Sequence, residues 1–392
     1  MAPLRKTLAL ERGVAALATG LFVFGFGQEL WFRYLPVYLR FLGATPLVLG
    51  AFGALKDLLD AAYAYPGGAI TDRLGSRKSL VLFGAVTVAG FAVYLAWRSV
   101  AGVFAGILLV MAWPSLGLPA TFSIIGEELA GARRVVGFTV QAIVKRVPIV
   151  VAPVVGGLLI GKFGVARGMR VGFAVSIVLG TAMLVILRRR FRGPASPPAK
   201  REARPRLPPV LRRLLAADIL VRLCEGLPDV FIVVWVVEVR RLSPAQFGVL
   251  TSILTATAIV SYLPAAFFAE RAEKKWFVVL TYVFFTLYPV AVLLSGSFLA
   301  LAGAFAIGGL REIGEPARKA LIVDSAHPSG RGRTVGYYYA VRGFSVAGAA
   351  AVGGWLWTIR PSLTFLVAAA LGAAGTLGAA LLLPGRRSVL PG

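Results

Sequence analysis

The sequence contains a single cysteine, Cys224, and a single histidine, His327. One cysteine cannot form an intramolecular disulfide, and one histidine cannot supply a metal site that needs several imidazole ligands. The two residues offer no credible cysteine-histidine nucleophile, and no apolar segment combines serine, histidine and aspartate. The chain is therefore predicted to be neither an enzyme nor the holder of a metal ion or another cofactor.

Charged residues are also scarce, at 15% of 392 residues, whereas hydrophobic residues make up 58%. This composition leaves too little polar surface to cover a water-soluble globule, so we predict an all-α membrane protein that crosses the bilayer many times. Apolar runs of about 20 residues are long enough to cross a hydrocarbon layer of about 30 Å. We predict spans at residues 13–40, 46–70, 79–97, 100–126, 137–160, 168–187, 211–238, 244–269, 276–295, 298–324, 334–359 and 362–384.

The 42 Lys and Arg residues far outnumber the 17 Asp and Glu residues. They lie mostly between the spans, so they indicate topology and attraction to anionic headgroups, and nucleic acid is not an expected partner. The face with both termini is much richer in Lys and Arg, which predicts cytoplasmic termini for a monomer in the plasma (inner) membrane. Residues 188–210 are basic and proline-rich, which predicts a cytoplasmic linker between an N-terminal half, 1–187, and a C-terminal half, 211–392.

The two halves repeat each other. Thr45-Pro46 opens the second span and Ser243-Pro244 opens the eighth, each as a helix cap followed by proline at the first helical position. At nearly the same shift along the chain, Gly156-Gly157 in the fifth span matches Gly353-Gly354 in the eleventh. Two similar units of six spans are typical of transporters that are built from parallel repeats.

The segment between the second and third spans is a short polar loop with a characteristic spacing of glycines and charges. Its residues are Gly68, Asp72, Arg73, Gly75, Arg77 and Lys78, and the half-chain shift places Glu270 and Arg271 at the corresponding point of the second half. This pattern closely resembles the loop signature of the major facilitator superfamily of secondary transporters. The resemblance implies twelve transmembrane helices in two pseudo-symmetric six-helix halves, and a cytoplasmic gate formed by these loop residues.

The fifth span contains part of a second signature of that superfamily, which occurs in its antiporters. Pro153, Gly156 and Gly157 match this signature, whereas Pro148 and Ala152 stand where it has glycines. The resemblance therefore favours a secondary transporter that is similar to the proton-coupled antiporters.

Equal numbers of acidic and basic residues lie inside the predicted spans, where each would cost roughly 2.5–3.5 kcal/mol if it faced lipid at the bilayer centre. This balance predicts ion pairs, and helical spacing predicts which residues share a face. The spacing groups Glu29 with Arg33, Lys56 with Asp60, and Asp218, Arg222, Glu225 and Asp229 in one stripe. Asp218 lies near the start of its span and is expected to be a near-terminal charge. In the tenth span, Gly314 and Pro316 are expected to loosen the helix.

A carboxyl group in a mostly apolar cavity can exchange a proton as water access alternates. The candidates for proton coupling are Glu29, Glu225, Glu312 and Asp57. The candidates for the substrate cavity are Arg33, Lys56, Trp113, Gln141, Lys145, Arg146, Asp229, Arg311, Glu315, Tyr338 and Arg342. The family resemblance implies that the helices carrying these residues line a central cavity.

The favoured hypothesis is a secondary active transporter that moves a small molecule by alternating access, in proton-coupled efflux (antiport). An alternative is an exchanger or importer of an organic anion or a phosphorylated metabolite, because Lys145 and Arg342 place basic residues at corresponding points of the two halves. Transport of hydrophobic cations would favour the first, and transport of phosphate esters the second. A non-transporting receptor with a transporter fold is a minor alternative, which counterflow in proteoliposomes would exclude.

Overall fold

A computed structural model of the protein describes residues 12–117, 120, 121, 124, 132–190, 207–269, 273–325 and 331–383. All regular secondary structure in these residues is helical, which confirms the predicted all-α fold. Five described stretches are long and apolar enough to cross a membrane: Ser76–Ala96, Val144–Arg189, Pro244–Ser261, Lys275–Leu294 and Pro361–Leu382. By length and apolar composition, these stretches satisfy the requirement for membrane spans.

The chain divides into two compact units that exchange short segments. Unit 1 comprises Met1–Ala44, Leu59–Arg201 and Ser243–Val249, and unit 2 comprises Thr45–Leu58, Glu202–Leu242 and Leu250–Gly392. Helix α4 (Pro46–Leu74) and helix α11 (Pro244–Ala269) therefore each contribute to both units. The predicted boundaries at residues 187, 188, 210 and 211 stay a prediction, and residues 191–206 of the linker lie outside the described part of the chain.

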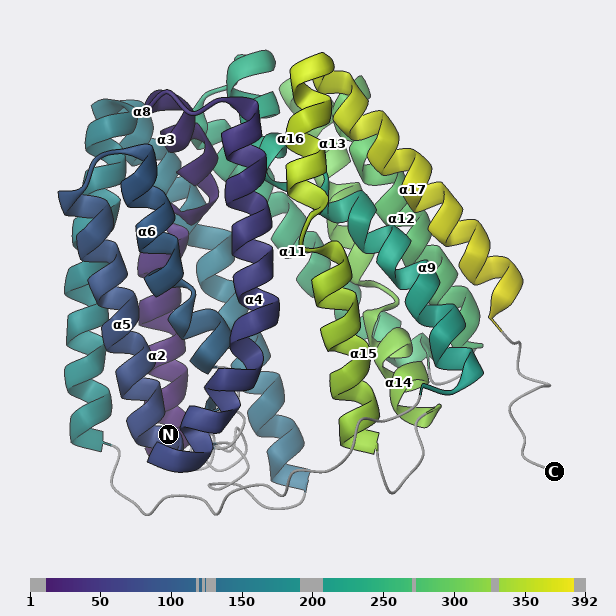
Figure 1. The fold of residues 1–392 in the computed structure, drawn as a ribbon, viewed down its shortest axis with the longest axis horizontal. Coiled ribbons are helices and arrows are strands. Elements are labelled where there is room, and N and C mark those ends of the chain that lie inside the picture. Colours follow the sequence, from purple (N-terminus) through teal and green to yellow (C-terminus); the bar gives the residue numbers. More distant parts are fainter. Residues whose placement is uncertain are drawn as a thin grey trace. The chain divides into compact units, whose positions relative to one another are not determined.

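Unit 1 contains both long helices and short helical segments (Figure 1). Besides parts of α4 and α11, they are α2 (Arg12–Glu29), η1 (Phe32–Tyr34), α3 (Leu35–Phe41), α5 (Ser76–Ala96), α6 (Val100–Val110), η2 (Ala112–Leu116) and α8 (Ala132–Arg190). Gly164 interrupts α8 with a backbone φ of 75°, so the stretches before and after it correspond to the predicted fifth and sixth spans.

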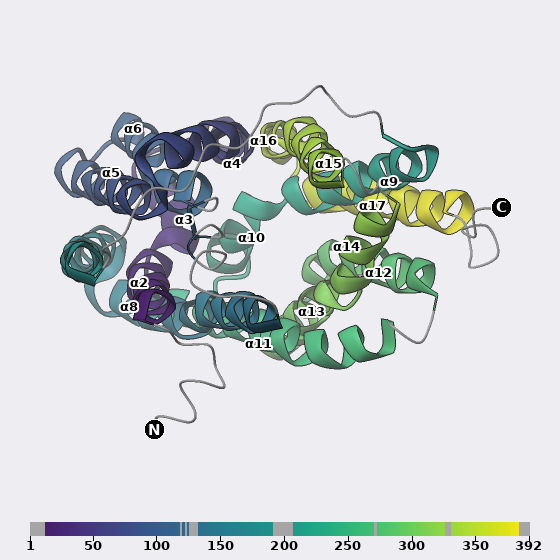
Figure 2. The same cartoon turned by 90° about the horizontal axis from the view of Figure 1, so that it is seen from below.

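Unit 2 contains the start of α4, most of α11 and the remaining helices of the C-terminal half (Figure 2). These are α9 (Pro209–Gly226), α10 (Asp229–Val234), η3 (Trp235–Val239), α12 (Lys274–Leu294), α13 (Phe298–Gly309), η4 (Leu310–Glu312), α14 (Glu315–Asp324), α15 (Arg331–Val346), α16 (Ala349–Ile359) and α17 (Pro361–Leu382). Helix α12 packs along α13 and α14, and α9 packs along α17 and α15.

The first, fourth, seventh, tenth and eleventh spans are broken near their middle, whereas α4, α5, α11, α12 and α17 run through without a break. Leu30 and Trp31 separate α2 from η1, and the short helix η4 separates α13 from α14. The predicted weakness around Gly314 is confirmed, because α14 begins at Glu315 directly after it. Broken helices leave backbone groups that need partners within the protein, since lipid offers none.

One threonine in each unit supplies such a partner. In unit 1, the backbone N–H of Trp113 in η2 donates to Oγ1 of Thr87 on α5, at 2.9 Å. In unit 2, the backbone N–H of Gly314 donates to Oγ1 of Thr281 on α12, at 2.6 Å. In each half, a threonine of the third helix (α5 or α12) thus accepts a hydrogen bond from a backbone N–H that the break in the fourth helix leaves without a helical partner.

The half-chain repeat also appears in the helix caps and close contacts. Ser99 caps α6 by accepting from the backbone N–H of Gly102, and Ser297 caps α13 by accepting from that of Ala300, at 3.0 and 3.2 Å. A side chain at Gly248 would meet the carbonyl oxygen of Pro153 at 2.5 Å, and one at the repeated position Gly50 would meet that of Ala350 at 2.6 Å. Equivalent contacts at repeated positions support the two pseudo-symmetric halves.

The predicted polar loop at residues 68–80 is much shorter in the structure. Helix α4 continues to Leu74 and α5 begins at Ser76, so Gly75 alone makes the turn. Its φ of 83° lies in the region that only glycine adopts without strain. Asp72 and Arg73 are therefore helical residues with exposed side chains, and Arg77 and Lys78 belong to the first turn of α5.

Candidate functional site

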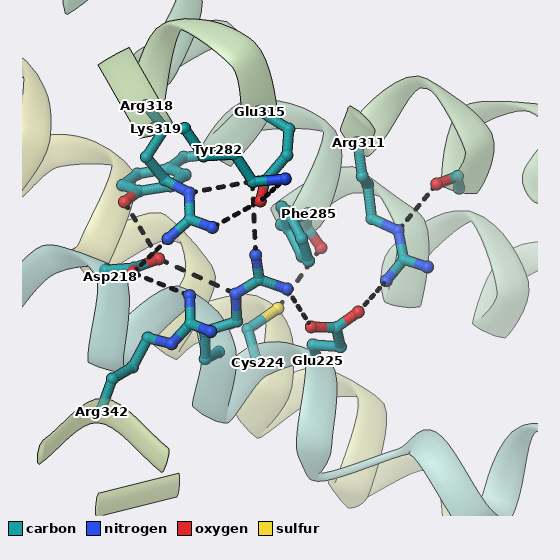
Figure 3. Close-up of polar contacts among 12 residues, drawn as sticks. Asp218, Cys224, Glu225, Tyr282, Phe285, Arg311, Glu315, Arg318, Lys319 and Arg342 are labelled. Atoms are coloured by element: carbon teal, nitrogen blue, oxygen red, sulfur yellow. Dashed lines mark hydrogen bonds and ion pairs between the residues drawn. The ribbon is translucent and has the colours of Figure 1, made fainter. Parts of the chain in front are cut away.

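The densest group of charges in the described residues lies inside unit 2, and we name it the Asp218 cluster. Its members are Asp218, Arg222, Glu225, Arg311, Glu315, Arg318, Lys319 and Arg342, which are joined by ion pairs (Figure 3). They come from α9, η4, α14 and α15. The charged side chains of η4 and α14, which belong to the broken tenth span, thus lie next to those of α9.

Asp218 is the buried centre of this cluster. Its carboxylate is 0% exposed and accepts hydrogen bonds from four side chains: Arg318 at 2.6 Å, Tyr338 at 2.9 Å, Arg342 at 3.3 Å and Tyr282 at 3.3 Å. A buried carboxylate is tolerated only with such partners. The sequence-based interpretation of Asp218 as a near-terminal charge is wrong, because α12, α14 and α15 pack around it and remove it from solvent.

Arg318 and Glu315 form a two-pronged ion pair beside Asp218. Nε and Nη2 of Arg318 donate to the two oxygens of Glu315, at 2.9 and 2.7 Å, and Arg318 is 1% exposed. This fork geometry fixes the orientation of both side chains. Arg318 was not among the residues predicted for the cavity, since sequence spacing places it close to the end of its span.

Glu225 is the accessible acid of the cluster. It accepts from Nη1 of Arg222 at 2.7 Å and from Nη1 of Arg311 at 3.3 Å, and its side chain is 34% exposed. Arg311 also lies over the rings of Tyr288 and Phe285, at 4.6 and 5.0 Å from their centroids. These aromatic faces hold the guanidinium group in place whether or not Glu225 is charged.

The cluster carries more positive than negative charge. Among its described ion pairs, four arginines and Lys319 face three carboxylates, those of Asp218, Glu225 and Glu315. Lys319 is the most exposed of the cations, at 53%. An excess of cations beside an accessible acid is suited to binding an anionic group.

A second, smaller group joins the start of α4 to α10 within unit 2. Nζ of Lys56 lies 2.6 Å from Asp229 and 3.5 Å from Asp57, so one cation serves two carboxylates. The predicted pairing of Lys56 with Asp60 is wrong. Asp60 instead accepts a hydrogen bond from Oγ of Ser115 in unit 1, at 2.6 Å.

In unit 1, the predicted pair of Glu29 and Arg33 is confirmed, with 3.1 Å between Oε2 and Nε. Trp113 is buried and its ring stacks on that of Phe24 at 4.5 Å between centroids, which is a packing role. Lys145 is exposed and Arg146 is half-buried on α8. Whether they face a substrate stays a prediction, and the side chain of Gln141 lies outside the described residues.

The two family signatures have different structural roles. Gly156 and Gly157 allow close packing, since a side chain on Gly156 would meet the carbonyl oxygen of Leu30 and one on Gly157 that of Pro244. The carbonyl oxygen of Pro153 accepts a hydrogen bond from the hydroxyl of Tyr34, at 2.6 Å. Gly68 has open space beside it on α4. The gate role stays a prediction, and Glu270 and Arg271 lie outside the described residues.

The remaining candidates lie within unit 2. Glu312 belongs to η4 and is half-buried, and Tyr338 is fully buried with its hydroxyl on Asp218. Among the described residues, no group of three or more His, Cys, Asp or Glu side chains could hold a metal ion. The charged side chains of the Asp218 cluster are chemically able to bind ions and to exchange protons.

Known proteins of similar sequence and fold help to interpret this geometry. The family model described as Major Facilitator Superfamily matches residues 214–392. A solved POT family transporter in complex with a thioalcohol-conjugated peptide has a TM-score of 0.78 and 14% identity, over 95% of this chain and 95% of its own. The nucleoside transporter NupG has a TM-score of 0.78 and 13% identity, over 95% of this chain and 100% of its own.

The human organic anion transporter MFSD10 is also similar, with a TM-score of 0.65 and 15% identity, over 94% of this chain and 99% of its own. No curated protein matches the sequence. At these identities the structures establish a common fold, and the family match covers α10 to α17 with most of α9. The C-terminal half of the chain therefore matches the Major Facilitator Superfamily model, and the chain as a whole has the fold of these solved transporters.

Proposed function

We propose that the chain transports a small molecule with a carboxylate or phosphate group by alternating access, and that a proton travels with it. The observation that carries this proposal is the excess of cations over carboxylates in the Asp218 cluster, next to the accessible Glu225. The solved structures of similar fold include complexes with a thioalcohol-conjugated peptide, with 5-aminolevulinic acid and with sulfate, and the last two ligands are an acid and an anion.

The three acids of the cluster have different tasks in this proposal. Asp218 and Glu315 both accept hydrogen bonds from Arg318, buried for Asp218 and partly buried for Glu315. In this proposal they remain negatively charged and balance the charge of Arg318. Glu225 is more accessible and shares Arg222 and Arg311. When Glu225 takes up a proton, it releases these two guanidinium groups, and the anionic group of the substrate can replace it. Proton and anion then occupy the site together.

The substrate class can be tested with defined probes. Purified protein is heated in the presence of 5-aminolevulinic acid, a dipeptide, glycerol 3-phosphate or the hydrophobic cation tetraphenylphosphonium, because a ligand of the folded state raises its melting temperature. We expect at least one anionic or zwitterionic probe to stabilise the protein and the cation to have no effect. Arg311→Gln removes this shift, whereas the control Arg212→Gln, at an exposed position of α9, retains it. Stabilisation by the cation alone would contradict the proposal.

Proton-coupled efflux is the second candidate, and the sharing of Lys56 by two carboxylates favours it. If Asp57 takes up a proton, Lys56 remains paired with Asp229, so the proton can bind without an anionic substrate. Glu29 beside Arg33 offers a similar site in unit 1. Efflux of tetraphenylphosphonium from proteoliposomes that is driven by a pH gradient and lost in Asp57→Asn or Glu29→Gln would support antiport. Unchanged efflux in both variants would exclude these two acids as its coupling sites.

We further propose that the protein works as a monomeric transporter, without enzymatic activity, in the plasma membrane and with both termini in the cytoplasm. The single native cysteine, Cys224, is buried, so it gives a low background for thiol labelling. A cysteine introduced next to either terminus should react with a membrane-impermeant maleimide only after the cells are opened. Labelling of intact cells would reverse the proposed topology.

A further inference from the structure

A pocket of about 360 Å³ lies in unit 1, where α5 begins and α8 ends. Three cations line it: Arg77 and Lys78 from the first turn of α5, and Arg188 from the last turn of α8. Lys78 and Arg188 are exposed. The two helices pack along each other, so this cationic group is a fixed feature of unit 1 and is separate from the Asp218 cluster.

The rest of the pocket is apolar. Val81, Leu82 and Ala85 follow the cations along α5 at helical spacing, and Leu187 precedes Arg188 on α8. Leu82 is 43% exposed. The pocket therefore passes from positive charge at the end of the helices to apolar side chains deeper along them.

The outer surface next to the pocket is also apolar. On α8, Val185 and Ile186 are 44% and 36% exposed, immediately before the lining residues. Ser76–Ala96 and Val144–Arg189 are both long and apolar enough to cross the membrane. Exposed aliphatic side chains on such helices face hydrocarbon chains, so the pocket opens toward lipid.

We propose that this pocket binds an acidic phospholipid of the membrane leaflet in which α5 begins. The phosphate lies among Lys78, Arg188 and Arg77, and one acyl chain lies along Leu82, Ala85 and Leu187. Basic pockets between transmembrane helices are suited to anionic headgroups, and each Lys or Arg adds about 1 kcal/mol of attraction. The apolar lining selects a lipid over a free phosphate, because a soluble anion gains nothing from aliphatic contacts.

The lipid would also stabilise the turn around Gly75. Arg77 and Lys78 follow this turn directly, and Arg188 ends the helix that packs beside α5. A phosphate shared by these residues joins the start of α5 to the end of α8. The proposal does not depend on the substrate of the Asp218 cluster.

Native mass spectrometry of the purified full-length chain tests the proposal directly. The probes are dioleoyl-phosphatidylglycerol and the zwitterionic dioleoyl-phosphatidylcholine, titrated into protein in detergent. We expect one phosphatidylglycerol to bind with clear preference over phosphatidylcholine. Lys78→Ala combined with Arg188→Ala should weaken this binding roughly 30-fold, which is what losing two cations of about 1 kcal/mol each implies. The charge-matched control, Arg212→Ala with Arg213→Ala on α9, should change it less than about threefold.

Ala85→Trp provides a second test that keeps every charge and fills the apolar part of the pocket. It should remove the same phosphatidylglycerol, and it remains informative if the double variant does not fold. Excess inorganic phosphate should not displace the lipid from the wild-type protein. Equal binding of the two lipids, unchanged binding in both variants, or displacement by inorganic phosphate would overturn the proposal.

Discussion

The two halves of this chain share an arrangement of helices and differ in the side chains that these helices carry. The half-chain shift that relates Pro46 to Pro244 places Gly20, Phe24 and Gly27 on α2 at the positions of Asp218, Arg222 and Glu225 on α9. In unit 1 these positions serve packing: Phe24 stacks on Trp113, and a side chain at Gly27 would meet Ser176. In unit 2 they carry the ion-pair cluster.

The contrast continues in the residues that surround these positions. Trp31 lies at the centre of unit 1, where it donates to Oγ of Ser176 at 2.8 Å and packs edge-on against Phe91, Tyr94 and Phe173. Aromatic packing of this kind is strong and insensitive to protons. The repeat therefore gives both halves similar helices and caps, while unit 2 carries the larger group of ion pairs.

Replacing Asp218 should have the largest effect on stability of the substitutions that compare the two halves. Asp218→Asn should lower the free energy of unfolding by about 3–5 kcal/mol, because it removes the buried negative charge that Arg318, Arg342 and Arg222 share. A thermal unfolding series in detergent measures the change. The matched control is Ser176→Ala in unit 1, which removes only neutral hydrogen bonds and leaves the indole N–H of Trp31 unpaired, so it should cost less, about 1–3 kcal/mol. Equal losses in the two variants would mean that the Asp218 cluster is no more critical than the aromatic core.

Thr87 and Thr281 test whether the helix breaks in the two halves are stabilised in the same way. Thr87→Val and Thr281→Val each leave a backbone amide of a broken helix without its partner, which should cost about 1–3 kcal/mol in either unit. Thr71→Val is the control, since its hydroxyl donates to the carbonyl of Gly67 within the same helix and frees no amide. If one threonine of the pair can be replaced without loss, the breaks in the two halves are not equivalent.

Gly75 provides a smaller effect that is confined to unit 1. Gly75→Ala should cost about 1–2 kcal/mol, because its φ of 83° is unfavourable for any residue with a Cβ atom. The corresponding turn of unit 2 has Glu273 in an ordinary extended conformation, with a φ of −67°. Gly68→Ala is the control, since this glycine is helical with open space beside it and alanine favours the helix. A stable Gly75→Ala would indicate that the turn can be rebuilt.

Much of the scaffold could be predicted from the sequence, because hydrophobic run length and repeated caps are local signals. The break at Gly314 followed from glycine and proline inside an apolar run. The ion-pair partners of the charged residues were harder to predict from the sequence. Spacing along one helix paired Lys56 with Asp60, but the closest carboxylate belongs to Asp229 on α10.

Asp218 was missed for the same reason. Its depth depends on Tyr282, Arg318 and Tyr338, which come from three other helices and are distant in the sequence. The apolar residues Leu214, Leu215 and Val221 on both sides of Asp218 in the sequence were a signal of its burial, and all three are buried in the structure. Burial inside a bundle is a property of packing among helices, and the sequence of one helix does not determine it.

The measurement that tests the account most directly is the pH dependence of anion transport in Glu225→Gln. Uptake of the anionic probe that stabilises the wild-type protein is followed in proteoliposomes, with and without an inward proton gradient. A glutamine cannot exchange a proton, so the variant should fold, bind the anion and exchange it across the membrane, but lose acceleration by the gradient. Uptake by Glu225→Gln that the gradient still accelerates as in the wild-type protein would contradict the assignment of proton coupling to this residue.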